Sequence, residues 1–72
     1  MIFLTTVNKL EQALASAKGL SADLKTFAMD TDDQNAKQMF NMLSTNAENM
    51  AQMLQNRVNY VKGEEPQYNQ QQ

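Results

Sequence analysis

Apolar residues recur every three or four positions along the second half of the chain, the spacing that lines one face of an α-helix. The stripe lies within residues 31–62 and is interrupted by one charged residue, Arg57. Its members are Ala36, Phe40, Leu43, Ala47, Met50, Leu54 and Val61. Two flanking rows widen it: Met39, Met53 and Tyr60 on one side, and Ala51 and Val58 on the other. This pattern predicts a helix over residues 32–62 with a face wider than one partner helix covers.

The first half of the chain shows the same period. Its stripe consists of Val7, Leu10, Leu14, Ala17, Leu24 and Ala28, with Ser21 in one place, and a second row holds Ala13, Leu20 and Phe27. We expect a helix over residues 6–29, capped by Thr5 or Thr6, after an apolar lead-in over residues 1–5. Gly19 falls on the outward face, where it is either a tolerated surface glycine or a point of close approach or bending.

A short acidic segment separates the two periodic runs. Its sequence Thr31-Asp32-Asp33-Gln34 fits a capping box, so Thr31 is the predicted N-cap and Gln34 its reciprocal partner, after a turn at residues 30–31. The aspartates suit the positive end of a helix dipole. A calcium or magnesium site is the weaker interpretation, because the residues that follow do not continue an EF-hand pattern.

The second helix should end before Gly63, because glycine favours the position after a helix and Pro66 cannot continue one. Residues 64–72 are polar and rich in glutamine, so we expect a disordered tail. The predicted organisation is an apolar lead-in at 1–5, a helical hairpin at 6–63 and the tail. The short connection makes the fold all-α, an antiparallel two-helix hairpin.

The flanking rows remain uncovered in an isolated hairpin, and monomers rarely expose a contiguous apolar patch of that size. We therefore expect a homodimer in which two hairpins form a four-helix bundle. The predicted interface residues are Ala13, Leu20, Phe27, Met39, Met53 and Tyr60.

Three polar residues of the two stripes need separate interpretations. Arg57 lies near Glu11 at one end of the predicted bundle, and an ion pair between them is favoured over ligand capture by Arg57. Ser21 and Asn46 are candidates for fixing the register of the helices.

The residue inventory argues against an enzyme. The chain of 72 residues contains no histidine and no cysteine, so the commonest general base, metal ligand and thiol nucleophile are missing. No glycine-rich phosphate loop is present, and the carboxylates fall mainly on outer faces, the turn or the tail. We expect no catalytic residues, cofactor or metal. The row Met39, Met42, Met50 and Met53 is better explained as core or adaptable interface than as a Cu(I) site.

Charge and hydropathy limit the partners further. The net charge is −2, the pI is about 4.8, and the six basic residues are scattered singly. Nucleic-acid binders usually carry a basic patch, so we expect no nucleic-acid binding and no stable membrane contact. The apolar start, residues 1–4, is too short for a secretory leader or a membrane span, which favours a cytoplasmic location.

Several segments resemble a family of short helical proteins of endospore-forming bacteria, the domain-of-unknown-function family 1657. The matching segments are Leu-Ala-Ser-Ala-Lys-Gly at 14–19, Phe-Ala at 27–28, Thr-Asp-Asp-Gln-Asn-Ala-Lys-Gln-Met-Phe at 31–40 and Glu-Glu-Pro-Gln-Tyr at 64–68. The apolar start and the glutamines after Tyr68 depart from the family pattern. No matching segment is a catalytic signature.

The resemblance implies a role in sporulation, spore germination or spore resistance, in the sporulating cell or the spore. We therefore predict a non-enzymatic helical structural or adaptor protein that acts through protein–protein contacts, with a spore membrane or germination protein as a candidate partner. Two alternatives remain: a bundle that binds a small molecule or metal, and a peripheral membrane-associated element.

Overall fold

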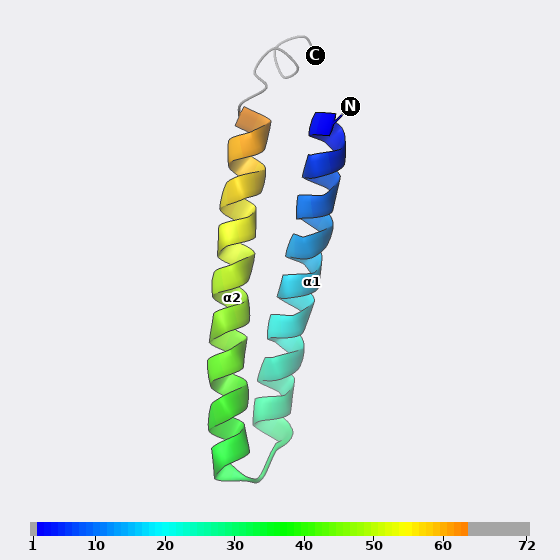
Figure 1. Ribbon diagram of the computed structural model, residues 1–72. Helices are drawn as coiled ribbons and strands as arrows, with labels where there is room; N and C mark the ends of the chain where they lie inside the picture. Colours follow the sequence, from blue (N-terminus) through cyan, green and yellow to red (C-terminus); the bar gives the residue numbers. More distant parts are fainter. Residues whose placement is uncertain (1, 64–72) are drawn as a thin grey trace.

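The computed structural model describes residues 2–63 of the chain as two long helices, α1 (Ile2–Asp30) and α2 (Gln34–Gly63). Figure 1 shows them side by side and antiparallel, so that the start of α1 and the end of α2 share one end of the molecule. We call this the open end and the connection at residues 31–33 the turn end. The predicted two-helix hairpin is confirmed. The predicted tail lies outside the described residues.

The start of α1 differs from the expectation. Residues 2–5 belong to the helix and do not form a separate lead-in. Thr5 and Thr6 lie inside α1, so neither is its N-cap. The physical reason is that residues 2–6 contain no glycine or proline, and a threonine that is a good cap also tolerates a helix interior.

The turn uses a different cap from the predicted one. The backbone N–H of Ala36 donates to Oδ2 of Asp33 at 2.8 Å, and the N–H of Lys37 donates to the carbonyl of Asp33 at 2.8 Å. Asp33 is therefore the N-cap of α2. The hydroxyl of Thr31 instead donates to the carbonyl of Phe27 at 2.6 Å, at the end of α1. The predicted capping box of Thr31 and Gln34 is therefore wrong, because the N-cap lies two residues after Thr31.

Small residues dominate the contact between the helices. The buried residues are Val7, Leu14, Ala17, Ser21 and Ala28 of α1, and Ser44, Ala47, Ala51 and Val58 of α2. Leu14, Ala17 and Ala51 form one cluster, and Leu54 packs against it. Small side chains let two helix axes approach closely, but they bury little apolar surface per residue.

A reciprocal serine pair lies in this contact. The hydroxyl of Ser44 donates to the carbonyl of Ser21 at 3.0 Å, the hydroxyl of Ser21 to the carbonyl of Ser44 at 3.3 Å, and the two hydroxyl oxygens are 3.3 Å apart. The two buried side chains thus satisfy each other. Asn46, the other candidate for register, is exposed.

The buried face of α2 is turned relative to the predicted stripe. Ser44, Ala51 and Val58 face α1, whereas Leu43 and Met50 are exposed. The buried stripe of α1, by contrast, follows the prediction from Val7 to Ala28. Ser44 and Ala51 face α1 in place of Leu43 and Met50 because two helices that approach closely accept only small side chains between them, even when larger ones are more hydrophobic.

Candidate functional site

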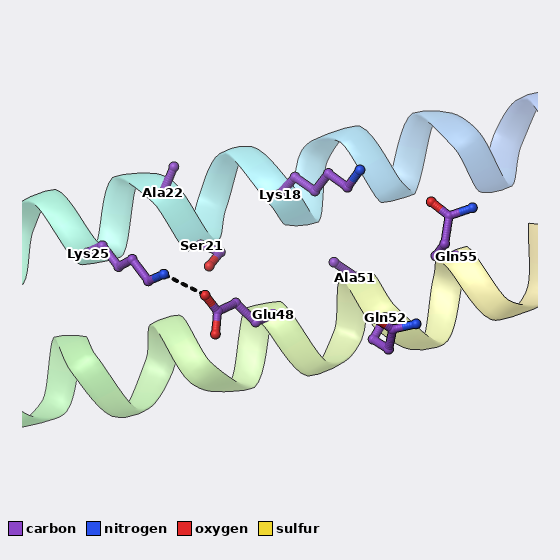
Figure 2. Close-up of a pocket in the computed structure, with 8 residues that line it drawn as sticks. All are labelled: Lys18, Ser21, Ala22, Lys25, Glu48, Ala51, Gln52 and Gln55. Carbon is purple, nitrogen blue, oxygen red and sulfur yellow. Dashed lines mark ion pairs between the residues drawn. The ribbon is translucent and has the colours of Figure 1, made fainter.

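The hairpin has two long edges, one on each side of the contact between its helices, and one of them is polar. An open groove runs along this edge, lined by Lys18, Ser21, Ala22, Lys25, Glu48, Ala51, Gln52 and Gln55 (Figure 2). An ion pair crosses it between Lys25 Nζ and Glu48 Oε2 at 2.7 Å, and Lys62 Nζ lies 3.0 Å from Glu11 Oε2. These side chains are about half exposed, so the pairs fasten the helices weakly.

The opposite edge is apolar. We call it the apolar edge and define it as Ala13, Leu20 and Phe27 of α1 with Met39, Leu43, Met50 and Met53 of α2. Leu20, Phe27, Met39 and Met50 are each about 47–49% exposed, and Met53 is 71% exposed. Single exposed apolar residues are normal in proteins, but a row of this length along both helices is not.

One ring contact and one open groove connect the two helices along the apolar edge. The ring of Phe27 lies 5.8 Å from the ring of Phe40, tilted by 58°. Toward the open end, Leu10 of α1 lines an open groove together with Met50, Met53, Leu54 and Arg57 of α2. The apolar surface therefore continues from one helix to the other.

All six residues of the predicted interface are exposed in the hairpin. They are Ala13, Leu20, Phe27, Met39, Met53 and Tyr60. Sequence reasoning missed Leu43 and Met50, which it had assigned to the contact between the helices. Leu43 and Met50 are seven residues apart, and each lies one helical turn from Met39 or Met53. This spacing could have indicated that they belong to the apolar edge.

Arg57 is not at the contact between the helices. Its guanidinium lies 5.0 Å from the ring centroid of Tyr60, at the open end, where a cation–π interaction is favourable. The predicted ion pair with Glu11 is wrong, because Glu11 pairs with Lys62. Gly19 does not mark a close approach, since a Cβ built there would meet nothing within 4 Å.

No three His, Cys, Asp or Glu side chains within residues 2–63 are placed to hold a metal ion. In the same range, no buried side-chain nitrogen or oxygen lacks a hydrogen-bond partner. Neither α1 nor α2 contains a stretch long and apolar enough to cross a bilayer. The most distinctive feature of the hairpin is a surface, the apolar edge with its exposed leucine, phenylalanine and methionine side chains.

Comparison with known proteins places the chain by family. A family model described as a protein of unknown function (DUF1657) matches residues 10–58. This range includes the apolar edge and the turn. No curated protein and no solved structure matches the chain.

Proposed function

Because this chain belongs to the DUF1657 family, whose description assigns no activity, we propose its function from the hairpin: a non-enzymatic structural or adaptor protein that works as a homodimer. The observation that carries the proposal is the apolar edge. In the dimer, two apolar edges pack together into a four-helix bundle. The outer faces then remain for other proteins.

The balance of buried and exposed side chains supports this pairing. Of the buried apolar residues of the hairpin, Ala17, Ala28, Ala47 and Ala51 have only a methyl side chain. The larger side chains Leu20, Phe27 and Met50 are about half exposed. Full burial of a Leu, Phe or Met contributes about 1.5–3 kcal/mol each. A second copy supplies that burial.

The residue types on the apolar edge suit an adaptable protein interface. Methionine is flexible and polarisable, and it packs against partners of different shape. Met39, Met50 and Met53 provide three such side chains on α2. Away from the apolar edge, α2 adds amide pairs, with the Gln52 amide donating to Asn56 and the Gln55 amide to Asn59, each at 3.0 Å. These groups are neutral and suit a partner protein better than a phosphate or a metal.

The cellular setting in this proposal comes from the resemblance of the chain to proteins of endospore-forming bacteria. The protein acts in the cytoplasm of the sporulating cell or in the spore and binds a spore membrane or germination protein. Affinity purification from sporulating cells, followed by mass spectrometry, tests this role. Recovery of the protein with no other protein enriched over a mock purification contradicts the adaptor role but leaves a purely structural dimer intact.

The dimer is tested by Leu20→Glu. A carboxylate in the centre of the apolar edge would be desolvated on pairing, so we expect the mass from light scattering at micromolar concentration to fall from dimer to monomer. Ala15→Glu is the matched control: it adds the same charge to α1 on an exposed position outside the apolar edge. A monomeric mass for the unmodified protein with its helical circular dichroism intact contradicts the proposal.

A further inference from the structure

A second row of side chains runs along α1 beside Ala13, Leu20 and Phe27. It consists of Lys9, Ser16, Asp23 and Asp30, each seven residues from the next and each exposed. Residues three and four apart on a helix are neighbours, so this row forms the rim of the apolar edge. It is basic toward the open end, neutral in the middle and acidic toward the turn end. Lys9 and Asp23 take no part in the ion pairs described within residues 2–63.

We propose that the two copies in the dimer pack antiparallel, α1 against α1, with the turn end of each hairpin beside the open end of the other. This inference rests on the proposed function, because it specifies the orientation of that dimer. The rim is self-complementary only in this orientation. Helix α1 spans Ile2–Asp30, so a two-fold axis at its midpoint passes Ser16. Lys9 then lies opposite the partner subunit's Asp23, and the pair occurs twice.

The sizes of the apolar side chains agree with the same axis. With α1 fully overlapped on its copy, Ala13 lies about opposite the partner subunit's Leu20. A methyl group therefore meets a large side chain on both sides of the axis. Such alternation of small and large residues lets two helices interdigitate.

The same-end dimer, with both turns together, lacks these matches. In that arrangement α1 packs beside the partner's α2. The contact between Ser21 and Ser44 shows which residues of the two antiparallel helices lie at the same height along the hairpin. At this register Lys9 lies at the height of Asn56, and Asp23 at the height of Met42. Neither is a charge partner.

The turn end adds a further cost to the same-end dimer. Asp30, Asp32 and Asp33 are exposed there, and Lys37 is the nearest basic residue in the sequence. A same-end dimer places two such groups of aspartates side by side, where like charges repel. The antiparallel dimer separates them by the length of the hairpin.

The orientation is read directly from a distance between the two turn ends. The chain has no cysteine, so Asp32→Cys introduces a single site for a spin label at the turn, one residue before the cap Asp33. A 30-residue helix is about 45 Å long, so pulsed electron resonance should find the two labels about 45 Å apart. A distance under about 20 Å overturns the antiparallel orientation while the dimer stands. A monomeric mass with no dipolar signal overturns the dimer itself.

The rim pairing is tested by reversing charges. Asp23→Lys sets lysines opposite each other at two places, and we expect the dimer Kd at low salt to rise about tenfold. Adding Lys9→Glu restores the pair with its signs exchanged, which should return Kd to within about threefold of the original. Asp32→Lys is the matched control with the same charge change at the turn, and its Kd should stay within about threefold. A double variant that binds no better than Asp23→Lys overturns the pairing.

Discussion

At the scale of single residues, the buried serine pair explains why the helices meet where they do. Each hydroxyl donates to the backbone carbonyl of the other serine. Both polar side chains are therefore hydrogen-bonded although they are buried at the contact. Both serine side chains are buried, so a leucine at either place would push the helices apart. The pair thus fixes which faces of α1 and α2 meet.

We predict that Ser44→Leu lowers the free energy of unfolding by about 1–3 kcal/mol, because a larger side chain must push the helices apart and leaves the Ser21 hydroxyl poorly paired. Urea unfolding monitored by circular dichroism measures the change at a fixed protein concentration. Thr45→Leu adds an exposed leucine one residue away and should change the stability by no more than about 0.5 kcal/mol. Equal effects of the two variants contradict the role given to Ser44.

Sequence reasoning succeeded at α1 and failed at α2 for one physical reason. In α1 the stripe that the sequence predicts, including Leu14 and Leu24, is also the one at the contact. In α2, either Leu43 and Met50 or Ser44 and Ala51 could face α1, and hydrophobicity favours Leu43 and Met50. The contact selects Ser44 and Ala51 because closely packed helices exclude long side chains. The displaced residues make the apolar edge larger than the sequence predicted.

At the scale of the elements, the turn shows how two acceptable caps compete. Thr31 and Asp33 are both residue types that favour the N-cap position. Each has a residue three positions later whose backbone N–H could donate to the side chain of the cap. The structure uses Asp33 for α2 and leaves the Thr31 hydroxyl to bond the carbonyl of Phe27 at the end of α1. Both helix ends at the turn are thereby stabilised.

We predict that Asp33→Ala costs about 1 kcal/mol of stability, because the N–H of Ala36 loses its acceptor at the first turn of α2. Asp33→Asn keeps an oxygen for that bond and should recover most of the loss. Asp32→Ala removes the same charge from the neighbouring residue and should be nearly neutral. Thermal unfolding of the three variants distinguishes a cap at Asp33 from a general effect of acidic residues near the helix.

The sequence predicts the presence of both helices more accurately than the residues at which they begin and end. Periodicity extends over most of both helices, so their presence and order follow from the sequence. The ends depend on which of several adequate caps is used, and residues 2–5 contain nothing that stops a helix. That is why α1 starts at Ile2 and not near Thr6.

At the scale of the whole molecule, the hairpin and the dimer should be one cooperative unit. The contact between α1 and α2 buries mainly alanine, serine and valine side chains, so an isolated hairpin has a small core for two helices of 29 and 30 residues. Most of the large apolar side chains would gain burial in the proposed dimer, where two apolar edges meet.

We therefore predict that the melting temperature depends on protein concentration. Mass action stabilises a dimer as concentration rises, and a hundredfold increase should raise the Tm by roughly 10 °C for a dimer of this size. Leu20→Glu should melt at a lower temperature and show no dependence on concentration. A concentration-independent Tm for the unmodified protein contradicts coupled folding and pairing.

The shared end of α1 and α2, visible in Figure 1, has a consequence for the proposed adaptor role. Gly63, the last residue of α2, lies at the end of the hairpin where α1 begins. In the proposed antiparallel dimer the Gly63 residues of the two copies would stand at opposite ends of a stiff rod about 45 Å long. Two identical binding sites near those ends would bridge two separate target molecules at a fixed spacing, and the avidity of the pair would far exceed the affinity of one site wherever targets are arrayed at that distance.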